Sequence, residues 1–173
     1  MQERQPDVVV LYGSSIIKAP LLEHYDGRII NLHLGLSPYY RGSGTNFWPL
    51  VYREPECVGA TIHLAVLRVD AGAILAQVRP LAEAGDRAHE LGCKTISAAL
   101  DAMPSVIQAY LNRQITPQTQ RLDTGRVFKQ KDFNAAAVQE MWRHFASGMM
   151  PEFLADAAAR YGRYPIISLE TAP

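Results

Sequence analysis

The sequence predicts an α/β domain in which a mixed, mostly parallel sheet carries a long kinked helix, with further helices toward the C-terminus. Two observations predict this class. Short apolar, β-branched runs alternate with turn residues over 7–78, as in a sheet whose strands are joined by loops and short helices. Apolar residues then recur at helical spacing from Asp86 onward. The 173 residues suffice for one domain with a core of its own.

Four segments have the residue pattern of strands. Asp7–Tyr12 is a continuous apolar run that ends at Gly13, which is typical of a strand buried on both faces, so we expect an interior strand. Arg28–Leu34 alternates polar Asn31 and His33 with apolar neighbours. Because successive side chains of a strand point to opposite faces, Asn31 and His33 leave the same face. The other strands are expected at 59–66 and 73–78, with a short late one at 125–128.

The expected helices follow from capping residues and apolar spacing. Asn46 is expected to cap a short helix through Trp48. Residues 86–112 predict a long amphipathic helix bent at Pro104. One or two further helices are expected after Asn134, divided by Pro151. The segments expected to form loops are 35–46 and 67–72.

Composition excludes several functional classes. Lys plus Arg and Asp plus Glu each total 17, so the net charge is zero and binding to nucleic acid by charge is disfavoured. The two cysteines belong to no CxxC or Cys/His cluster, which indicates no metal site and no disulfide framework. The start, Met1–Pro6, is polar and no apolar run could span a bilayer, so we expect a cytoplasmic protein without membrane contact.

Polar residues fall at the ends of the predicted strands. Asn31 and His33 are joined by Asp70, which lies seven residues beyond another strand histidine, His63. In open α/β sheets, ligands bind outside the carboxyl ends of the strands, where such residues converge. A strand histidine alone is more often a packed core residue than a catalyst, and His63 is interpreted as structural.

Four motif blocks follow one another along the chain: Asn31-Leu32-His33, Ser37-Pro38-Tyr39-Tyr40-Arg41-Gly42, Gly59-Ala60-Thr61-Ile62-His63, and Val69-Asp70-Ala71-Gly72-Ala73-Ile74 with Gln77. Together, these blocks resemble the folate-dependent formyltransferases, the superfamily of glycinamide ribonucleotide transformylase, methionyl-tRNA formyltransferase and the sugar N-formyltransferases. The resemblance covers about Asp7 to Phe133, which we take as the C-terminal portion of the catalytic domain (1–133), followed by a helical extension (134–173). It implies a partial Rossmann-like sheet.

The resemblance implies that Asn31, His33 and Asp70 form the catalytic trio. When an amine attacks the formyl carbon of N10-formyltetrahydrofolate, negative charge develops on the carbonyl oxygen, and fixed donors stabilise it. The amide of Asn31 and the imidazolium of His33 are the expected donors. The Asp70 carboxylate would favour the charged form of His33 and relay the proton that leaves the amine through a water.

The resemblance also implies a binding site for the formyl donor, N10-formyltetrahydrofolate, with no metal. The acceptor is expected to be an amine of a small molecule or sugar nucleotide. Transfer to tRNA is disfavoured by the zero net charge. Residues of two loops are expected to bind the donor, the second through main-chain contacts to the pterin ring: Ser15, Ile16, Ile17 and Lys18, and Val66, Leu67, Arg68 and Val69.

The chain departs from the family at its start, because relatives carry about three strands and two helices before the segment that corresponds to Asp7–Val10. Leu34 and Ala71 are milder departures, at positions where Pro and Thr are common. A strand such as Val8–Leu11 without a neighbour leaves backbone groups unpaired. We expect a second copy of the chain to cover this edge; the alternative is that the chain is a fragment.

Three functions remain open from the sequence. The first is formyl transfer to an amine. The second uses the same trio with water as nucleophile, as a formyltetrahydrofolate hydrolase. The third is a catalytically impaired folate-binding or assembly module. Retention of Asn31, His33 and Asp70 together favours catalysis.

Overall fold

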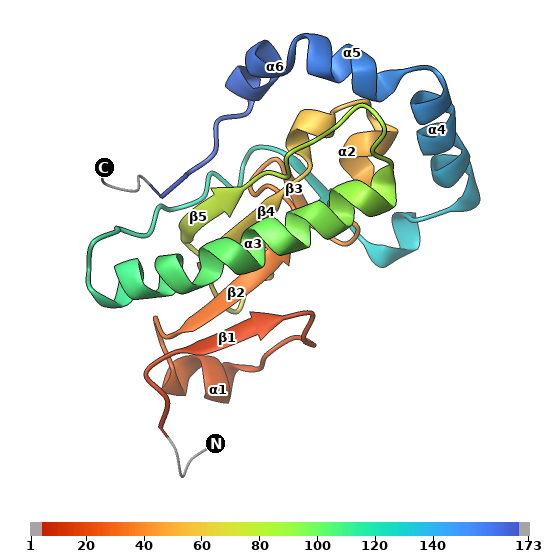
Figure 1. The fold of residues 1–173 in the computed structure, drawn as a ribbon. Helices are drawn as coiled ribbons and strands as arrows, with labels where there is room; N and C mark the ends of the chain where they lie inside the picture. Colours follow the sequence, from red (N-terminus) through yellow and green to blue (C-terminus); the bar gives the residue numbers. More distant parts are fainter. Residues whose placement is uncertain (1–4, 170–173) are drawn as a thin grey trace.

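The computed structural model describes residues 5–169 and has the predicted α/β class (Figure 1). Its main sheet contains β1 (Val9–Tyr12), β2 (Ile29–Leu34), β4 (Ala60–Leu64) and β5 (Ile74–Val78), in the order β1-β2-β4-β5. β1 runs parallel to β2, whereas β2 with β4 and β4 with β5 are antiparallel. The sheet is therefore mixed, as predicted, although only one of its three strand pairs within the described residues is parallel. The start of the chain, Met1–Arg4, lies outside the described residues.

One face of the sheet is covered by α3 (Ala88–Leu111), which runs uninterrupted through Pro104 (Figure 1). Apolar side chains line up on the facing surfaces because α3 is amphipathic and the strands alternate. The residues fully or nearly buried between them are Ile30, Leu32, Ala60, Ile62, Leu75 and Ala76 from the strands and Ala99, Met103 and Val106 from α3. This core fixes the orientation of β2 and β4.

The opposite face is only partly covered. α1 (Ala19–His24) packs there through Leu22 against Val9 and Ile29. Ile29 is the first residue of β2, so the residues two and four positions further, Asn31 and His33, share its face but lie beyond α1. The sheet thus buries the start of this face and leaves its end free for polar side chains.

A second, two-stranded parallel sheet pairs β3 (Tyr40–Gly42) with β6 (Arg126–Phe128). Residues 35–46 were expected to be loop throughout, but β3 forms within them. The short strand is held by its distant partner and by a stack of rings, since the centroids of Phe128 and Trp48 are 4.5 Å apart. Trp48 belongs to α2 (Trp48–Val51), which is followed by the 3-10 turn η1 (Pro55–Cys57).

The C-terminal helices pack on the same body. A 3-10 turn, η2 (Gln130–Asp132), leads into α4 (Ala135–Ala146), α5 (Met149–Ala155) and α6 (Ala157–Arg163), which arch over α2 in Figure 1. Met141, Met149 and Phe153 share a buried cluster with Leu50, Val58 and Leu91. From α6, Nη2 of Arg160 lies 3.0 Å from Oε2 of Glu56, which is only 2% exposed. An ion pair so buried ties α6 to η1.

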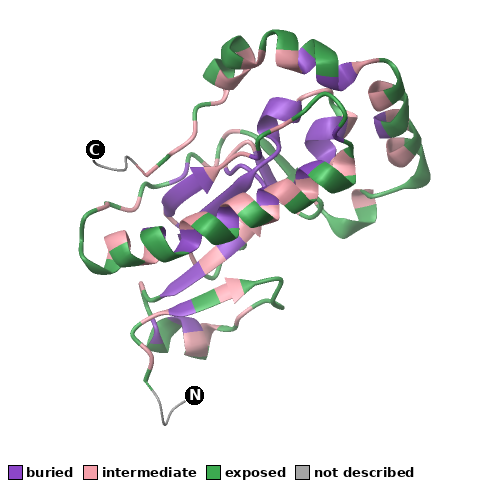
Figure 2. Cartoon of the chain, in the orientation of Figure 1, coloured by how far each residue is buried: buried purple, intermediate pink, exposed green. Residues whose placement is uncertain are grey.

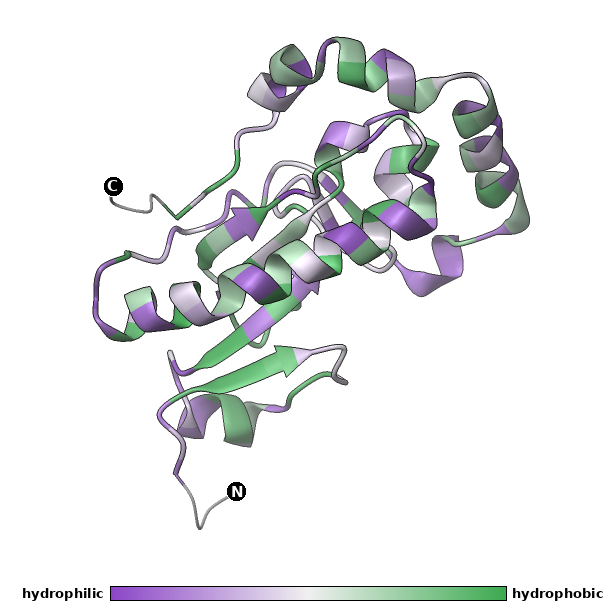
Figure 3. Cartoon of the chain, in the orientation of Figure 1, coloured by the Kyte–Doolittle hydropathy of each residue, from purple (hydrophilic) through white to green (hydrophobic). Residues whose placement is uncertain are grey.

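The expectation that Asp7–Tyr12 is an interior strand is wrong. β1 lies at the edge of the sheet, and its apolar residues Val10 and Tyr12 are 44% and 45% exposed. Figure 3 shows β1 as a hydrophobic strand, while Figure 2 shows much of it exposed or half-buried. The sequence pattern reports side-chain polarity, which cannot show whether a neighbouring strand is present. Within the described residues, β1 pairs with β2 alone.

Two residues that were expected to cap or separate helices do neither in the structure. Asn46 does not cap α2; its Oδ1 accepts a hydrogen bond from the N–H of Gly59 at 3.0 Å. Pro151 does not divide the last helices, because it lies in the first turn of α5, where proline is tolerated. The break comes at Gly148, which has a left-handed φ of 84°.

Candidate active site

Polar side chains gather on the sheet face opposite α3. Asn31 and His33 leave this face of β2 together, as predicted from the strand alternation, because Ile30 and Leu32 between them are buried against α3. His63 lies directly beside Asn31, since the two are register partners across β2 and β4. Three side chains able to form hydrogen bonds thus occupy one small area.

The Asp70 carboxylate reaches this area from the loop between β4 and β5. Its Oδ1 lies 3.4 Å from Nδ1 of His33 and 3.9 Å from Nε2 of His63. Its Oδ2 accepts a long hydrogen bond, 3.3 Å, from the N–H of Gly42. The side chains of His33 and Asp70 are each only 10% exposed. The structure therefore brings the three predicted residues, Asn31, His33 and Asp70, to one site.

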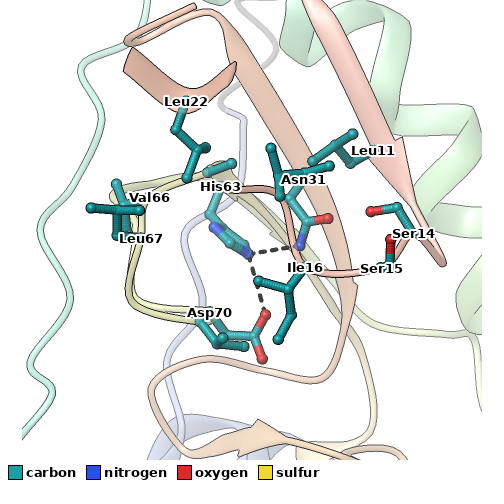
Figure 4. A pocket seen from close by; sticks show the side chains of 13 residues that line it. Leu11, Ser14, Ser15, Ile16, Leu22, Asn31, His63, Val66, Leu67 and Asp70 are labelled. Atoms are coloured by element: carbon teal, nitrogen blue, oxygen red, sulfur yellow. Dashed lines mark hydrogen bonds and ion pairs between the residues drawn. The ribbon is translucent and has the colours of Figure 1, made fainter. Parts of the chain in front are cut away.

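His63 fixes the orientation of Asn31. Nδ1 of His63 lies 2.8 Å from the carbonyl oxygen of Leu64, which can only accept, so this nitrogen carries the proton. Nε2 of His63 is then a free acceptor, and Nδ2 of Asn31 donates to it at 3.1 Å (Figure 4). The other N–H of the same amide remains available for a ligand. His63 is thus structural, as interpreted from the sequence, and also orients a site residue.

The expectation that His33 is an imidazolium is wrong for the free protein. Burial lowers the pKa of His33 to about 4; the Asp70 charge opposes this shift and His63 adds to it. The ring is therefore neutral near pH 7 and carries one proton. A proton on Nδ1 would suit Asp70, which accepts and cannot donate, and would leave Nε2 with a free lone pair.

Thr45 borders Nε2 of His33. Oγ1 of Thr45 lies 3.3 Å from this nitrogen, and the single proton of the hydroxyl is donated to the carbonyl oxygen of Leu34. This close packing needs Gly35, which has a φ of 151°. A Cβ at Gly35 would lie 2.5 Å from Thr45 and 2.9 Å from Nε2 of His33, so a larger residue would displace the ring.

Because His33 is buried in its neutral form, we expect the folded protein to lose stability in acid. The unfolded chain binds a proton at His33 near pH 6.5, whereas the folded chain binds it only near pH 4. As the pH falls from 7 to 5, this difference lowers the free energy of unfolding by about 2 kcal/mol. We expect His33→Gln to lose that part of the pH dependence, as measured by urea unfolding at pH 7 and pH 5.

The exposed His89 provides the matched control, since its ring lies on the outer face of α3. His89→Gln should keep the wild-type difference between the two pH values. If His33→Gln and wild type lose the same free energy of unfolding between pH 7 and pH 5, His33 is not held neutral by burial.

Two hollows meet at these residues. The smaller, of about 120 Å³, is lined mostly by apolar side chains from the loop after β1, from α1 and from the β4–β5 loop (Figure 4). The larger, of about 680 Å³, lies toward the loop formed by residues 42–47. Ser14, Asn31 and Asp70 line both. The polar group thus stands at the boundary between an apolar and a more polar hollow.

Most of the residues expected to bind a formyl donor line the smaller hollow. Those that do are Ser15, Ile16, Ile17, Val66, Leu67 and Val69. Lys18 and Arg68 are exposed and are not among the lining residues. Lys18 directly precedes α1. Sequence matching cannot distinguish a loop residue that lines the hollow from its neighbour on the outside.

Sequence reasoning missed several residues of the site. Thr45 and Gln120 contact His33 and the Asp70 loop but were not singled out, and Leu11 and Leu22 line the smaller hollow. Residues 42–47, which follow Arg41, line the larger hollow. The side chain of Arg41 itself is buried and donates to the carbonyl oxygen of Leu122.

Two classes of feature are absent from the described part of the chain. Within residues 5–169, no three His, Cys, Asp or Glu side chains are grouped closely enough to hold a metal ion. Among the helices of the same range, none is long and apolar enough to cross a membrane.

An amide, a buried imidazole and a carboxylate, set between two hollows of an α/β sheet, can move a proton and stabilise charge that develops in a reaction. The sequence profile of the formyl transferase family matches residues 1–107, more than half of the chain. The chain therefore belongs to the formyl transferase family, in agreement with the resemblance of its motifs.

Solved structures of formyltransferases have a similar fold. The formyltransferase PseJ of Anoxybacillus kamchatkensis, in complex with UDP-4,6-dideoxy-4-formamido-L-AltNAc and tetrahydrofolate, is 26% identical, with a TM-score of 0.60 over 75% of this chain and 67% of that one. The N-formyltransferase of Helicobacter canadensis, in complex with folinic acid and dTDP-3-aminofucose, is 22% identical, with a TM-score of 0.64 over 78% and 53%.

A phosphoribosylglycinamide formyltransferase from Anaplasma phagocytophilum is 22% identical, with a TM-score of 0.59 over 75% of this chain and 64% of that one. The chain thus spans between about half and two thirds of the length of these three structures. The Helicobacter canadensis and Anaplasma phagocytophilum structures are each 22% identical to this chain, so their similarity establishes the fold alone.

Proposed function

We propose that the chain transfers the formyl group of N10-formyltetrahydrofolate to an amine of a small molecule or sugar nucleotide, with Asn31, His33 and Asp70 as its catalytic trio. The observation that carries the proposal is the meeting of these three side chains between two hollows. A donor in one hollow and an acceptor in the other would bring their reacting atoms together at the trio.

The smaller hollow suits the donor because it exposes apolar side chains to solvent. Ile16, Leu67, Val69 and Val66 are 76%, 65%, 55% and 46% exposed, and all four line it. Such a concentration of exposed apolar surface is typical of a ligand site. A flat pterin ring would cover these side chains, while main-chain groups of residues 66–69 would bind its polar edge.

Asn31 would stabilise the transition state. When the amine nitrogen attacks the formyl carbon, the carbonyl oxygen becomes an oxyanion. Because His63 already holds one N–H of the Asn31 amide, the second N–H is fixed in direction before the ligand arrives. A donor that needs no reorganisation is worth about 100- to 1,000-fold in rate.

His33 would act as the base. With Nδ1–H directed at Asp70, its neutral ring would have a free lone pair on Nε2, and His33 lines the larger hollow, where the attacking amine would lie. Nε2 takes the proton of the amine as the new C–N bond forms, and it returns that proton to N10 as the old bond breaks. The products are a formamide and tetrahydrofolate. Asp70 stabilises the imidazolium that forms in between.

The larger hollow suits a polar acceptor. Asp70 is its only ionisable carboxylate, and no Lys or Arg is among the described residues that line it. Two of the similar structures are complexes with sugar nucleotides, which supports an amino sugar as the acceptor for this chain. The residues that line the larger hollow would therefore recognise the amine of the acceptor rather than a phosphate.

One assay tests the function. The purified chain is incubated with N10-formyltetrahydrofolate, and release of tetrahydrofolate is followed with no amine and with a panel of simple amines, amino sugars and UDP- or dTDP-linked amino sugars. We expect release that depends on the amine, with the formamide as second product. Asn31→Ala, with an expected loss of about 100- to 1,000-fold, is the control for contaminating activity.

The other outcomes overturn the proposal in distinguishable ways. Equal release without any amine would indicate a hydrolase. Binding of folinic acid without release, with every amine tried, would indicate a folate-binding module. Formyl transfer that survives Asn31→Ala unchanged would remove the role given to the amide.

We further propose that a second copy of the chain packs on β1, because Val10 and Tyr12 are half exposed on an edge strand. Light scattering should then report twice the mass of 19.2 kDa, and Val10→Lys should shift it toward a single chain. A single chain in wild type at all concentrations would contradict this assembly.

A further inference from the structure

Gln120 lies beneath the loop that carries Asp70. The segment after α3 runs back along β5, where the backbone N–H and carbonyl of Gln118 each pair with Ile74 at 2.8 Å. Two residues further on, the side chain of Gln120 turns inward and is only 7% exposed. Pairing with the edge of β5 therefore places the long polar side chain of Gln120 beneath the Asp70 loop.

The amide of Gln120 holds the backbone on both sides of Ala71. Its Nε2 donates to the carbonyl oxygen of Asp70 at 3.0 Å and to that of Gly72 at 2.6 Å. With both of its hydrogens used, one amide group bridges two carbonyl groups of a single turn. This bridge acts on the loop at the very residue whose side chain points at His33.

The Asp70 loop needs such a restraint. Asp70 has a φ of 51°, a left-handed conformation that is strained for an L-residue. The contacts of its carboxylate are long: 3.3 Å to Gly42, 3.4 Å to His33 and 3.9 Å to His63. The two Gln120 hydrogen bonds are shorter than these contacts; the one to Gly72 is buried and the one to Asp70 is partly buried.

The two ends of the Gln120 amide differ in their contacts. Oε1 is buried and has no hydrogen-bond partner among the described residues. Gln120 also lines a third hollow, of about 670 Å³, which residues 165–168 line as well. The two hydrogen bonds from Nε2 are therefore the polar contacts that this side chain makes within the described residues.

We propose that Gln120 is a positioning residue that sets the Asp70 carboxylate, and through it the proton on Nδ1 of His33, for the formyl transfer proposed above. Gln120 touches neither hollow that meets at the trio. It acts only through the backbone of Asp70 and Gly72.

Gln120→Met tests this role, because it keeps the length and volume of the side chain and removes both hydrogen bonds. Gln118→Met is the matched control, since Gln118 is exposed on the same segment and uses only its backbone. We expect Gln120→Met to lower kcat by about 10- to 100-fold with a smaller change in the KM for donor. Gln118→Met should match wild type.

A double-mutant cycle shows whether Gln120 acts through Asp70. In an Asp70→Asn background, adding Gln120→Met should change kcat by less than about 2-fold, because the group that Gln120 positions is already absent. Equal losses in both backgrounds would overturn the proposal and leave Gln120 a general structural residue. If Gln120→Met does not fold, Gln120→Asn, which retains the donor but is too short to bridge both carbonyls, replaces it.

A readout without substrate separates this proposal from the function it rests on. The ¹⁵N chemical shifts of His33 near pH 7 report which ring nitrogen carries the proton. We expect the Nδ1–H form in wild type and Gln118→Met, and a shift toward the Nε2–H form in Gln120→Met and Asp70→Asn. An unchanged ring in Gln120→Met would overturn the positioning role, even if the chain transfers formyl groups.

Discussion

His33→Ala is expected to lower the turnover of formyl transfer by about 100- to 10,000-fold, because it removes the base that takes the proton of the attacking amine. His33 is among the residues that line the larger hollow. It is not among those that line the smaller hollow, where the donor is proposed to bind. Binding of the donor should therefore survive. Turnover is measured as amine-dependent release of tetrahydrofolate, and binding by calorimetry with folinic acid.

The control for this variant is His89→Ala, which removes an exposed ring from α3 and should leave both readouts unchanged. Far-ultraviolet circular dichroism would show whether His33→Ala keeps its fold. A folded His33→Ala protein with wild-type turnover would contradict the role of this residue as base.

Asp70→Asn is expected to lower turnover by about 100-fold or more while changing the volume of the side chain very little. An asparagine can present an N–H to Nδ1 of His33, which moves the ring proton to Nε2 and blocks the lone pair that the mechanism needs. The substitution also removes the charge that stabilises the imidazolium. Steady-state kinetics on the same amine panel measure the loss.

The pH dependence gives Asp70→Asn a second signature. Asp70 raises the pKa of His33, so its removal lowers that pKa further below the value of about 4 in wild type. If activity remains measurable, its acid limb should move to lower pH. Asp101→Asn, on the exposed face of α3, is the matched control. An acid limb that moves to higher pH in Asp70→Asn would contradict the pairing.

Much of the site could be predicted from the sequence because it depends on local rules. Strand alternation places Asn31 and His33 on one face whatever the rest of the chain does. The resemblance to the formyltransferases then implied Asp70 and the two loops. Where those rules apply, the structure agrees, since Val66 and Ile16 do line the smaller hollow.

The rest depends on partners that are distant in sequence. Whether the apolar run 9–12 lies inside a sheet or at its edge is decided by strands elsewhere, and β3 forms because β6, more than 80 residues later, pairs with it. Gln120 carries no local signal, because its two carbonyl acceptors lie about 50 residues earlier in the chain. The neutral state of His33 is likewise a consequence of burial, which residue type cannot reveal.

A crystal structure of the protein soaked with folinic acid tests the central claim most directly. The account predicts that the pterin ring covers Ile16, Val66 and Leu67 in the smaller hollow, with the N10 end of the ligand directed at Asn31 and His33. Density for the ligand at another surface would contradict it. So would a ligand in this hollow whose N10 end points away from Asn31, His33 and Asp70.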